Sequence, residues 1–377
     1  MGKTRVLHIK GTLSSDGATV IEYNFAQQLN KSVVFDWLLD AKAEKGWKEK
    51  YSALGSKVYH IKYKRTRGKV FNAIRKYKAY KRFFKRHKYN TIHIDTDGFH
   101  RVVELFAAKR AGVPQRIVHS HNTTAEVNGL LSKRKSLIRV GQWLYLHLAT
   151  DYVACSEDAG NWLFGEKNKN KTICLKNGID IQKYKFDPEK RERVRAQLGV
   201  DGCTVYGHVG RFEAQKNHKF LISVFKSIYE NNKDSRLLLI GEGSLKNEVE
   251  KMVQTEQLEQ AVIFLGNVDN VDHYYNAMDL FLFPSAFEGL GIVAIEAQCS
   301  GLPVIMSEGI PKLAKITQEC VYLPVEKGAD VWAQTAEKAA AYDPKERESK
   351  YKQIESAQFD IQTSAKKLSE IYLKKGE

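Results

Sequence analysis

Residues 284–305 read PSAFEGLGIVAIEAQCSGLPVI, and they are the most informative part of the sequence. A β-strand is expected to end at Pro284, and a loop that contains glycine follows it. The apolar residues after the loop then predict a helix from about Gly291 to Ser300, with Gly301 as its C-cap. A helix that starts directly after such a loop presents unpaired backbone N–H groups, which form a favourable seat for phosphate.

Two carboxylates in this stretch point to a ligand. Glu288 lies in the loop, where Gly289 and Gly291 allow the backbone to approach a bulky anion closely. Glu296 lies inside the otherwise apolar helix, where a carboxylate is costly to bury unless hydrogen bonds are donated to it. Two adjacent ribose hydroxyls would donate them, as in dinucleotide-binding folds. The alternative is a structural ion pair between Glu296 and a lysine or arginine.

A second cluster of charged residues follows the predicted strand at 204–210, TVYGHVG. Arg211 and Lys216 leave the end of this strand together, and a helix is expected to begin near Asn217. Ligands bind at the carboxyl ends of strands in open α/β sheets. Arginine binds phosphate through its planar fork and lysine acts as a point charge, so the pair could hold a diphosphate. Generic surface charge is the alternative.

The rest of the chain alternates short β-branched runs with longer helical patterns, which is typical of parallel sheets covered by helices. Six strands are expected in each half. The sequence therefore predicts an α/β protein of two Rossmann-like domains, with a turn at Asn177-Gly178 between them. We assign residues 1–177 to the first domain and 178–357 to the second. The segment 358–377 is expected to form an amphipathic helix that completes the second domain or crosses back to the first.

Composition narrows the class of protein. The chain has 377 residues, of which 43% are hydrophobic and 28% charged, which is typical of a folded globular protein. No apolar run is long enough to span a bilayer, and the opening residues do not resemble a signal peptide. The five cysteines are widely spaced, so neither a disulfide framework nor a zinc site is expected.

The positive charge is concentrated in the first half of the chain. Residues 1–180 contain 34 Lys and Arg against 15 Asp and Glu, whereas the remainder is slightly acidic. The segment 62–88 is the most basic part, with apolar residues at helical spacing. We interpret it as a surface that docks on anionic membrane, with Phe83 and Phe84 as the insertion point. A plain solvated helix is the alternative, and no nucleic-acid motif accompanies the charge.

The pattern of Glu288 and Glu296, together with Arg211…Lys216, KNGID (176–180) and IGEG (240–243), resembles the retaining glycosyltransferases of family four. The resemblance implies the GT-B fold and a nucleotide-sugar substrate, with no further cofactor. It implies that Glu296 binds the donor ribose, that Glu288 contacts the transferred sugar, and that Arg211 and Lys216 hold the diphosphate. It places the remaining donor contacts of the second domain at Gly289, Leu290, Gly291, Ile292, Asn267 and Val268.

The first half matches the family more loosely. The family usually opens with a paired-glycine loop. Here only Gly17 matches that loop, and the resemblance places Gly17 among the donor-binding residues. A histidine near the reacting sugar is expected after the fifth strand, and His121 fits this position better than His119. Asp95-Thr96-Asp97 spells a DxD sequence, which we interpret as a turn after a strand rather than as a metal site. No metal is expected.

The function expected from the resemblance is transfer of a sugar, with retention of configuration, from a nucleotide-diphosphate sugar to a saccharide or lipid-linked acceptor of surface polysaccharide synthesis. A UDP-sugar is favoured over a GDP-sugar. We expect a cytoplasmic protein, peripheral at the inner face of the cell membrane. The alternatives are a nucleotide-sugar epimerase on the same fold, and a non-catalytic protein that binds membrane or nucleic acid.

Overall fold

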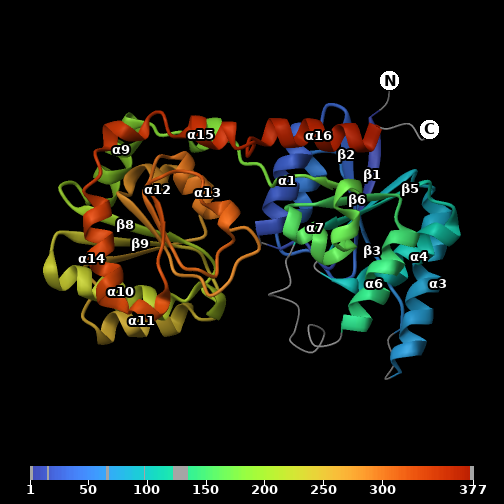
Figure 1. Ribbon diagram of the computed structural model, residues 1–377, viewed down its shortest axis with the longest axis horizontal. Coiled ribbons are helices and arrows are strands. Elements are labelled where there is room, and N and C mark those ends of the chain that lie inside the picture. Colours follow the sequence, from blue (N-terminus) through green and yellow to red (C-terminus); the bar gives the residue numbers. More distant parts are fainter. Residues whose placement is uncertain (1–2, 15–16, 65–67, 97, 122–134, 374–377) are drawn as a thin grey trace. The chain divides into compact units, whose positions relative to one another are not determined.

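The computed structural model describes residues 3–14, 17–64, 68–96, 98–121 and 135–373. The chain forms two units (Figure 1). The first unit comprises residues 1–178 together with 361–377, and the second comprises residues 179–360. The chain therefore passes into the second unit once and returns to the first with its last helix.

The first unit is built on a parallel sheet of seven strands in the order β3-β2-β1-β4-β5-β6-β7. The strands are β1 (Thr4–Lys10), β2 (Val33–Leu39), β3 (Val58–His60), β4 (Thr91–Thr96), β5 (Gln115–Ser120), β6 (Asp151–Ala154) and β7 (Thr172–Cys174). All seven residues of β2 are buried. A parallel strand covered on both faces needs apolar residues at nearly every position, which is why β2 reads as an almost continuous apolar run.

The helices of the first unit include the last helix of the chain. They are α1 (Gly17–Leu29), α2 (Trp47–Ala53), α3 (Lys69–His87), α4 (Val102–Ala111), α6 (Lys135–Leu148), α7 (Glu157–Phe164) and α16 (Ile361–Leu373), with 3-10 turns η1 (Phe99–Arg101) and η2 (Glu166–Lys171). α16 packs against α1. Gln115 at the start of β5 donates from Nε2 to the carbonyl of Ile371 at 2.7 Å. Side chains of α16 therefore complete the first unit.

The second unit is built on a parallel sheet of six strands in the order β10-β9-β8-β11-β12-β13. The strands are β8 (Thr204–Val209), β9 (Ser235–Ile240), β10 (Val262–Gly266), β11 (Leu280–Phe283), β12 (Val304–Met306) and β13 (Cys320–Tyr322). Its helices are α8 (Ile181–Tyr184), α9 (Pro188–Leu198), α10 (His218–Asn231), α11 (Lys246–Thr255), α12 (Val271–Ala277), α13 (Ile292–Cys299), α14 (Ala329–Ala340) and α15 (Tyr351–Ser356). Its 3-10 turns are η3 (Ala214–Lys216), η4 (Lys312–Ala314), η5 (Val325–Lys327) and η6 (Pro344–Arg347).

The predicted strands are confirmed, with one omission. All six strands expected in each half are present, but β7 at the edge of the first sheet was not predicted. β7 has only three residues, and each of them is half-buried. An edge strand this short carries no periodicity that would distinguish it from a loop.

The predicted insertion point on the basic helix α3 is wrong. Phe84 is buried, and Phe83 stacks on His87 with ring centroids 4.2 Å apart. Tyr80 and Phe84 are one helical turn apart on the face that packs on the sheet, so the second half of α3 turns its aromatics inward. The apolar residues near its first turns are exposed instead. Within the described ranges, no helix has the length and apolar character needed to cross a membrane.

Candidate active site

The strand order of the second sheet reverses between β8 and β11, which lie side by side with Tyr206 opposite Leu280. Such a switch point leaves a crevice outside the carboxyl ends of the strands, where ligands bind in open α/β sheets. Arg211 and Lys216 follow β8, and Glu288 follows β11. The fold therefore brings the two charged clusters identified in the sequence to one edge of one sheet.

Close backbone contacts hold the loop after β8. A Cβ atom at Gly241 would overlap the carbonyl group of Gly210, and one at Gly243 would lie 2.5 Å from backbone atoms of Phe212. Only glycine fits at these two positions, which explains the IGEG sequence after β9. Arg211, between the two contacts, is exposed. A firmly placed backbone thus presents a guanidinium group to the solvent at the switch point.

The loop after β11 is fastened on two sides. The N–H of Ala286 donates to the carbonyl of Gln215 at 2.8 Å, and the N–H of Glu288 donates to the carbonyl of Gly309 at 3.1 Å. A Cβ atom at Gly309 would overlap the carbonyl oxygen of Ala286. Glu288 is therefore placed by backbone contacts to the segments after β8 and after β12.

Lys216 and Glu288 form an ion pair. Lys216 Nζ donates to Glu288 Oε1 at 2.6 Å, and the side chains are only 14% and 10% exposed. The same ammonium group lies over the ring of Phe283, 5.0 Å from its centroid. The sequence predicts separate roles for the two residues, and the structure shows in addition that each neutralises the other. An anionic ligand that binds Lys216 would have to share this ammonium group with Glu288.

Helix α13 starts at the switch point. Gly291, its N-cap, has a left-handed φ of 77°, which L side chains rarely adopt. No described side chain caps this end. The preceding Leu290 is buried, whereas Gly289 and Ile292 are half-buried. The first turn of α13 therefore offers backbone N–H donors and the positive end of a helix dipole beside Lys216 and Glu288.

Glu296 lies one turn further along α13 and is 8% exposed. Its Oε2 accepts a hydrogen bond from the Tyr275 hydroxyl at 3.0 Å. Burial raises the pKa of Glu296 to about 7, although the hydroxyls of Tyr184 and Tyr275 oppose that rise. Among the described residues, no lysine or arginine lies within ion-pair distance of it. The structural alternative, an ion pair with a neighbouring cation, is therefore absent from this part of the chain.

Asn267 and Val268 follow β10 at the same edge of the sheet. β10 ends at Gly266, whose φ of 64° turns the chain away from the strand. The carbonyl of Gly266 accepts from the N–H of Gly241 at 2.9 Å, which ties this loop to the one after β9. Asn267 is exposed and Val268 is half-buried. They lie two strands from β8, at the same edge of the sheet as the loops that carry the charged residues.

Gly17 and His121 belong to the first unit. Gly17 is the first residue of α1, and a Cβ atom there would meet nothing within 4 Å. His121 follows β5, and its Nε2 donates to Asp95 Oδ1 at 2.7 Å. His119, the other candidate, is buried at the end of β5. Of the two histidines, His121 is the one with part of its ring exposed.

A family model described as glycosyl transferases group 1 matches residues 190–355. EpsF of Bacillus subtilis (strain 168), named as a glycosyltransferase, is 31% identical over 98% of this chain and 96% of its own length. The chain belongs to the group 1 glycosyltransferases. The prediction of a glycosyltransferase is confirmed.

Other relatives agree. A UDP-Gal:alpha-D-GlcNAc-diphosphoundecaprenol alpha-1,3-galactosyltransferase of Escherichia coli is 29% identical over 60% of this chain and 59% of its own. The crystal structure of Anabaena HepE with UDP and glucose superposes with a TM-score of 0.77 at 22% identity, covering 97% of this chain and 98% of that one. The structure of WaaG, a glycosyltransferase involved in lipopolysaccharide biosynthesis, gives 0.71 at 16% identity, covering 98% and 100%. The predicted GT-B fold is confirmed.

The interpretation of the DxD sequence of this glycosyltransferase as a turn is wrong for its first residue. Asp95 lies within β4 and its side chain is 7% exposed, so it is a strand residue aimed into the protein. Asp97 lies outside the described residues. A carboxylate buried within a strand is rare without partners, and here histidines supply them.

Two groups of side chains have the composition of a metal site. His93, Asp95 and His119 form one group, and Glu22, Asp95 and His121 form the other, with their ligand atoms within 4.8 Å of one another. Several of these atoms already have protein partners. His93 Nε2 is 3.2 Å from His119 Nδ1, and Asp95 Oδ1 binds His121. Hydrogen bonds within the protein therefore satisfy part of the cluster, whereas Asp95 Oδ2 and His119 Nε2 have no hydrogen-bond partner among the described residues. The absence of a metal stays a prediction.

Sequence reasoning missed the groups that surround the glutamates of this glycosyltransferase. Tyr275 on α12, which donates to Glu296, lies 21 positions before it in the sequence. Tyr184 on α8 is separated from Glu296 by a longer stretch of sequence. The pair of Lys216 with Glu288 spans 72 positions. No local sequence pattern links residues so far apart. These contacts could have been predicted only from the expectation that the residues lie at the same edge of one sheet.

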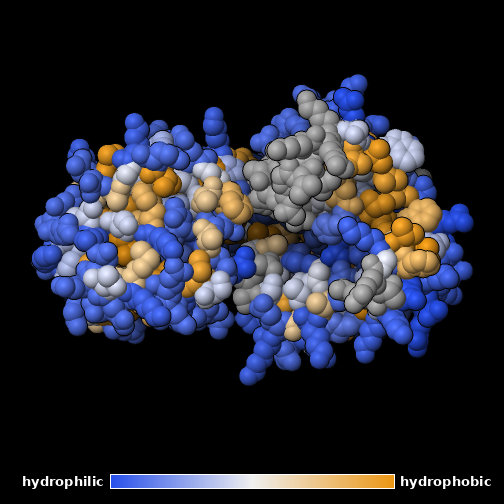
Figure 2. Space-filling model, turned by 90° about the horizontal axis from the view of Figure 1, so that it is seen from below, coloured by the Kyte–Doolittle hydropathy of each residue, from blue (hydrophilic) through white to orange (hydrophobic). Residues whose placement is uncertain are grey.

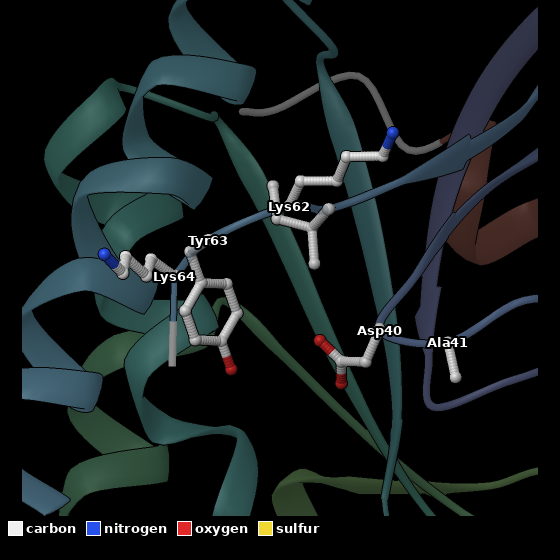
Figure 3. A pocket seen from close by; sticks show the side chains of 6 residues that line it. Asp40, Ala41, Lys62, Tyr63 and Lys64 are labelled. Carbon is white, nitrogen blue, oxygen red and sulfur yellow. The ribbon is translucent and has the colours of Figure 1, made fainter. Parts of the chain in front are cut away.

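The first unit contains a hollow at the carboxyl ends of β2 and β3. It is lined by Asp40, Ala41, Ile61, Lys62, Tyr63 and Lys64 (Figure 3). The Asp40 carboxylate and the Tyr63 ring point into the space between the two segments. Burial alone would raise the pKa of Asp40, but the Arg101 and Lys76 cations hold it below its ordinary value. Asp40 is therefore a charged wall of this hollow and not a proton donor.

Proposed function

We propose that this glycosyltransferase moves a sugar from a UDP-sugar to a lipid-linked saccharide with retention of configuration. The carrying observation is that Arg211, Lys216, the start of α13 and Glu296 gather at one switch point of the second sheet. Together they match the parts of a nucleotide sugar: two cations and helix N–H groups for the diphosphate, and a buried acceptor for ribose hydroxyls.

The choice of donor and acceptor rests on the relatives. The E. coli relative is named for a UDP-galactose donor and a diphosphoundecaprenol-linked acceptor. HepE has been crystallised with UDP-glucose. These names support UDP over GDP and a lipid-linked acceptor for surface polysaccharide synthesis.

Transfer builds negative charge on the departing phosphate. Arg211, Lys216 and the N–H groups of α13 are placed to stabilise that charge, so the proposed reaction uses no metal at the diphosphate. Glu288 is a poor candidate for a nucleophile, because its carboxylate is neutralised by Lys216 at 2.6 Å. We therefore favour a front-face reaction, in which the leaving phosphate accepts the proton of the acceptor hydroxyl while the new bond forms on the same face.

Docking on anionic membrane fits the surface of the first unit. α3 carries eight Lys and Arg and no acidic residue. Of the twelve large apolar side chains exposed in the described part of the chain, seven lie on α3, α4 and α6: Val70, Phe71, Ile74, Phe106, Leu137, Val140 and Trp143. α4 packs against both other helices, and Figure 2 shows apolar side chains gathered over α3 and α6 among hydrophilic ones.

This apolar and cationic surface supports a peripheral protein at the inner face of the cell membrane. Cations near an anionic bilayer contribute about 1 kcal/mol each, and apolar side chains insert at its interface. Lys62 and Lys64 line the hollow of Figure 3 and begin the same basic segment, so their charge would favour an acceptor that carries phosphate. Binding of nucleic acid is not part of the proposal.

Transfer is tested with UDP-glucose, UDP-galactose and GDP-mannose as donors and an undecaprenyl diphosphate-linked sugar in vesicles as acceptor. We expect UDP release that depends on acceptor, persists in EDTA and gives a product of the donor's anomeric configuration. Lys216→Met should lower turnover at least tenfold, whereas Lys219→Met is the matched control, because Lys219 pairs with Glu248 on the surface. Activity with the GDP-sugar alone, an inverted product or loss in EDTA would each remove the corresponding part of the proposal.

Membrane docking is tested by co-sedimentation with vesicles that contain or lack anionic phosphatidylglycerol. We expect binding to anionic vesicles that weakens with salt and is reduced by Phe71→Ser. The control is Val331→Ser, which removes an exposed apolar side chain from α14 in the second unit. Equal binding of both variants would contradict docking through α3.

A further inference from the structure

The first unit contains a buried cluster of imidazole rings around one carboxylate. Its members come from β1, β4, β5, the residue after β5, and α16: His8, His93, Asp95, His119, His121 and Tyr372. All except His121 lie almost entirely inside the protein. The side chains satisfy one another in part: Asp95 Oδ2, His8 Nδ1 and His119 Nε2 have no hydrogen-bond partner among the described residues. The contacts that are made therefore matter for the residue that reaches the surface.

That residue is His121, which is 15% exposed and bound to Asp95. Its Nε2 lies 2.7 Å from Asp95 Oδ1. Burial would raise the pKa of Asp95, but the surrounding imidazole groups outweigh burial and lower it well below its ordinary value. An ionised carboxylate only accepts hydrogen bonds, so Nε2 of His121 carries the proton. When the ring carries a single proton, Nδ1 is then the nitrogen left to act as an acceptor.

The buried members fix Asp95 from behind. The Tyr372 hydroxyl lies 2.7 Å from His93 Nδ1 and 3.3 Å from His8 Nε2. His93 Nε2 and His8 Nδ1 each lie 3.5 Å from an Asp95 oxygen. Burial lowers the pKa of His93 to about 3, so this ring is neutral at physiological pH. Among the described residues, His121 therefore makes the shortest contact with the Asp95 carboxylate.

The backbone and the ring of His121 are held as well. Its N–H donates to the carbonyl of Thr96 at 3.2 Å, and the Cys155 thiol donates to its carbonyl at 3.4 Å. Its ring lies beside that of His119, with centroids 4.0 Å apart. With main chain and ring thus placed, the bond to Asp95 decides which nitrogen is protonated.

We propose that Asp95 is a positioning residue of this glycosyltransferase: it orients the His121 ring and holds it in the tautomer with a bare Nδ1. The inference rests on the proposed function and on the role that the family resemblance implies for His121, a contact with the transferred sugar. There, a bare Nδ1 at a fixed place accepts a hydrogen bond from a sugar hydroxyl. A ring that flips or changes tautomer presents an N–H instead, and the sugar loses its alignment.

The test uses Asp95→Asn, which keeps the size of the side chain and removes its charge. Long-range ¹⁵N–¹H spectra of histidine-labelled protein report the tautomer of His121 without any substrate, with the signal assigned by its loss in His121→Asn. We expect protonated Nε2 in the wild type and a mixture of tautomers in Asp95→Asn. In the transfer assay, kcat should fall on the order of ten- to a hundredfold with the donor KM nearly unchanged.

A double variant separates positioning from a merely structural role. If Asp95 acts through His121, Asp95→Asn should lower kcat little further in a protein that already carries His121→Asn. Asp36→Asn is the control, because Asp36 is a buried carboxylate of the same sheet bound to Arg5 and Tyr89. It should lower stability while the His121 tautomer stays unchanged.

The outcomes distinguish this inference from the proposed function. An unchanged His121 tautomer in Asp95→Asn, or fully additive losses of kcat in the double variant, would overturn the positioning role while leaving the transferase intact. One equivalent of tightly bound zinc in the purified protein would also overturn it, because coordination would then replace the hydrogen bond. If no donor supports transfer, the proposed function fails, and the tautomer still decides whether Asp95 holds His121.

Discussion

Replacing Glu296 by glutamine should make the free protein more stable at neutral and alkaline pH. The carboxyl group is buried in α13 with a tyrosine hydroxyl and without an ion-pair partner among the described residues. Its ionised form is therefore unfavourable in the folded protein. Glutamine has the same shape, can accept the same hydrogen bond from Tyr275, and never ionises.

The size of the effect follows from the pKa of Glu296, which burial raises from 4.5 to about 7. Because the folded state holds this proton more tightly than the unfolded state, stability is lost as pH rises from 4.5 to 7 and stays constant above 7. Each pKa unit corresponds to about 1.4 kcal/mol, so ionisation costs the folded state about 3 kcal/mol in full. Between pH 5 and pH 8 the variant should gain about 2.5 kcal/mol relative to the wild type.

The assay is urea unfolding of both proteins at several pH values, followed by a probe in the second unit. Glu319→Gln is the control with the opposite slope: burial would raise the pKa of Glu319, but the hydrogen bond from Lys350 lowers it. Calorimetry with UDP should show the reverse ranking, with Glu296→Gln binding about tenfold more weakly, because a charged acceptor is lost. A difference in stability that does not change between pH 5 and pH 8 would refute the reasoning.

Three further predictions concern the second unit. Arg347→Met should destabilise it by about 3 kcal/mol or more in urea unfolding, because the buried guanidinium donates to several backbone carbonyls, including that of Tyr275 at 2.9 Å. Gly309→Ala should weaken UDP binding in calorimetry while the circular dichroism spectrum stays native, because the added Cβ displaces the carbonyl of Ala286 and with it the loop before α13. Tyr275→Phe should raise the pKa of Glu296 further, visible as a shift of its ¹³C carboxyl titration to higher pH.

The architecture could be predicted from the sequence, because a buried parallel strand contains a run of apolar residues that can be recognised in one sequence. The helix predicted from Gly291 to Ser300 is α13, Ile292–Cys299, and its start after glycine is where the sequence places it. β7 was not predicted, because its three half-buried residues show no periodicity of apolar and polar side chains. The DxD sequence misled because Asp95 looks like a turn residue until its histidine partners are known.

The surface of α3 shows why burial of individual side chains was harder to predict. Its apolar residues recur at helical spacing, but spacing alone does not say which turns lie over the sheet. Tyr80 and Phe84 are buried because that half of the helix packs inward, whereas Val70 and Phe71 near the first turns are 71% and 67% exposed. The periodicity therefore predicted the helix correctly, but the side chains expected at its surface, Phe83 and Phe84, are not the exposed ones.

The two glutamates that carry the family resemblance, Glu288 and Glu296, have opposite electrostatic environments. Glu288 has its charge balanced by Lys216, so a diphosphate that takes up this ammonium group leaves Glu288 with an uncompensated charge beside the transferred sugar. Glu296 has no such cation among the described residues, and its pKa near 7 lets it hold a proton until ligand hydroxyls donate to it. When a nucleotide sugar binds, both carboxylates would thus need hydrogen bonds from the ligand at the same time. In the proposed binding mode, a nucleotide alone donates hydrogen bonds only to Glu296, whereas a nucleotide sugar donates to both carboxylates, because its sugar hydroxyls would reach Glu288. UDP-sugar should therefore bind more tightly than UDP, and that preference should disappear in Glu288→Gln while Lys219→Met retains it.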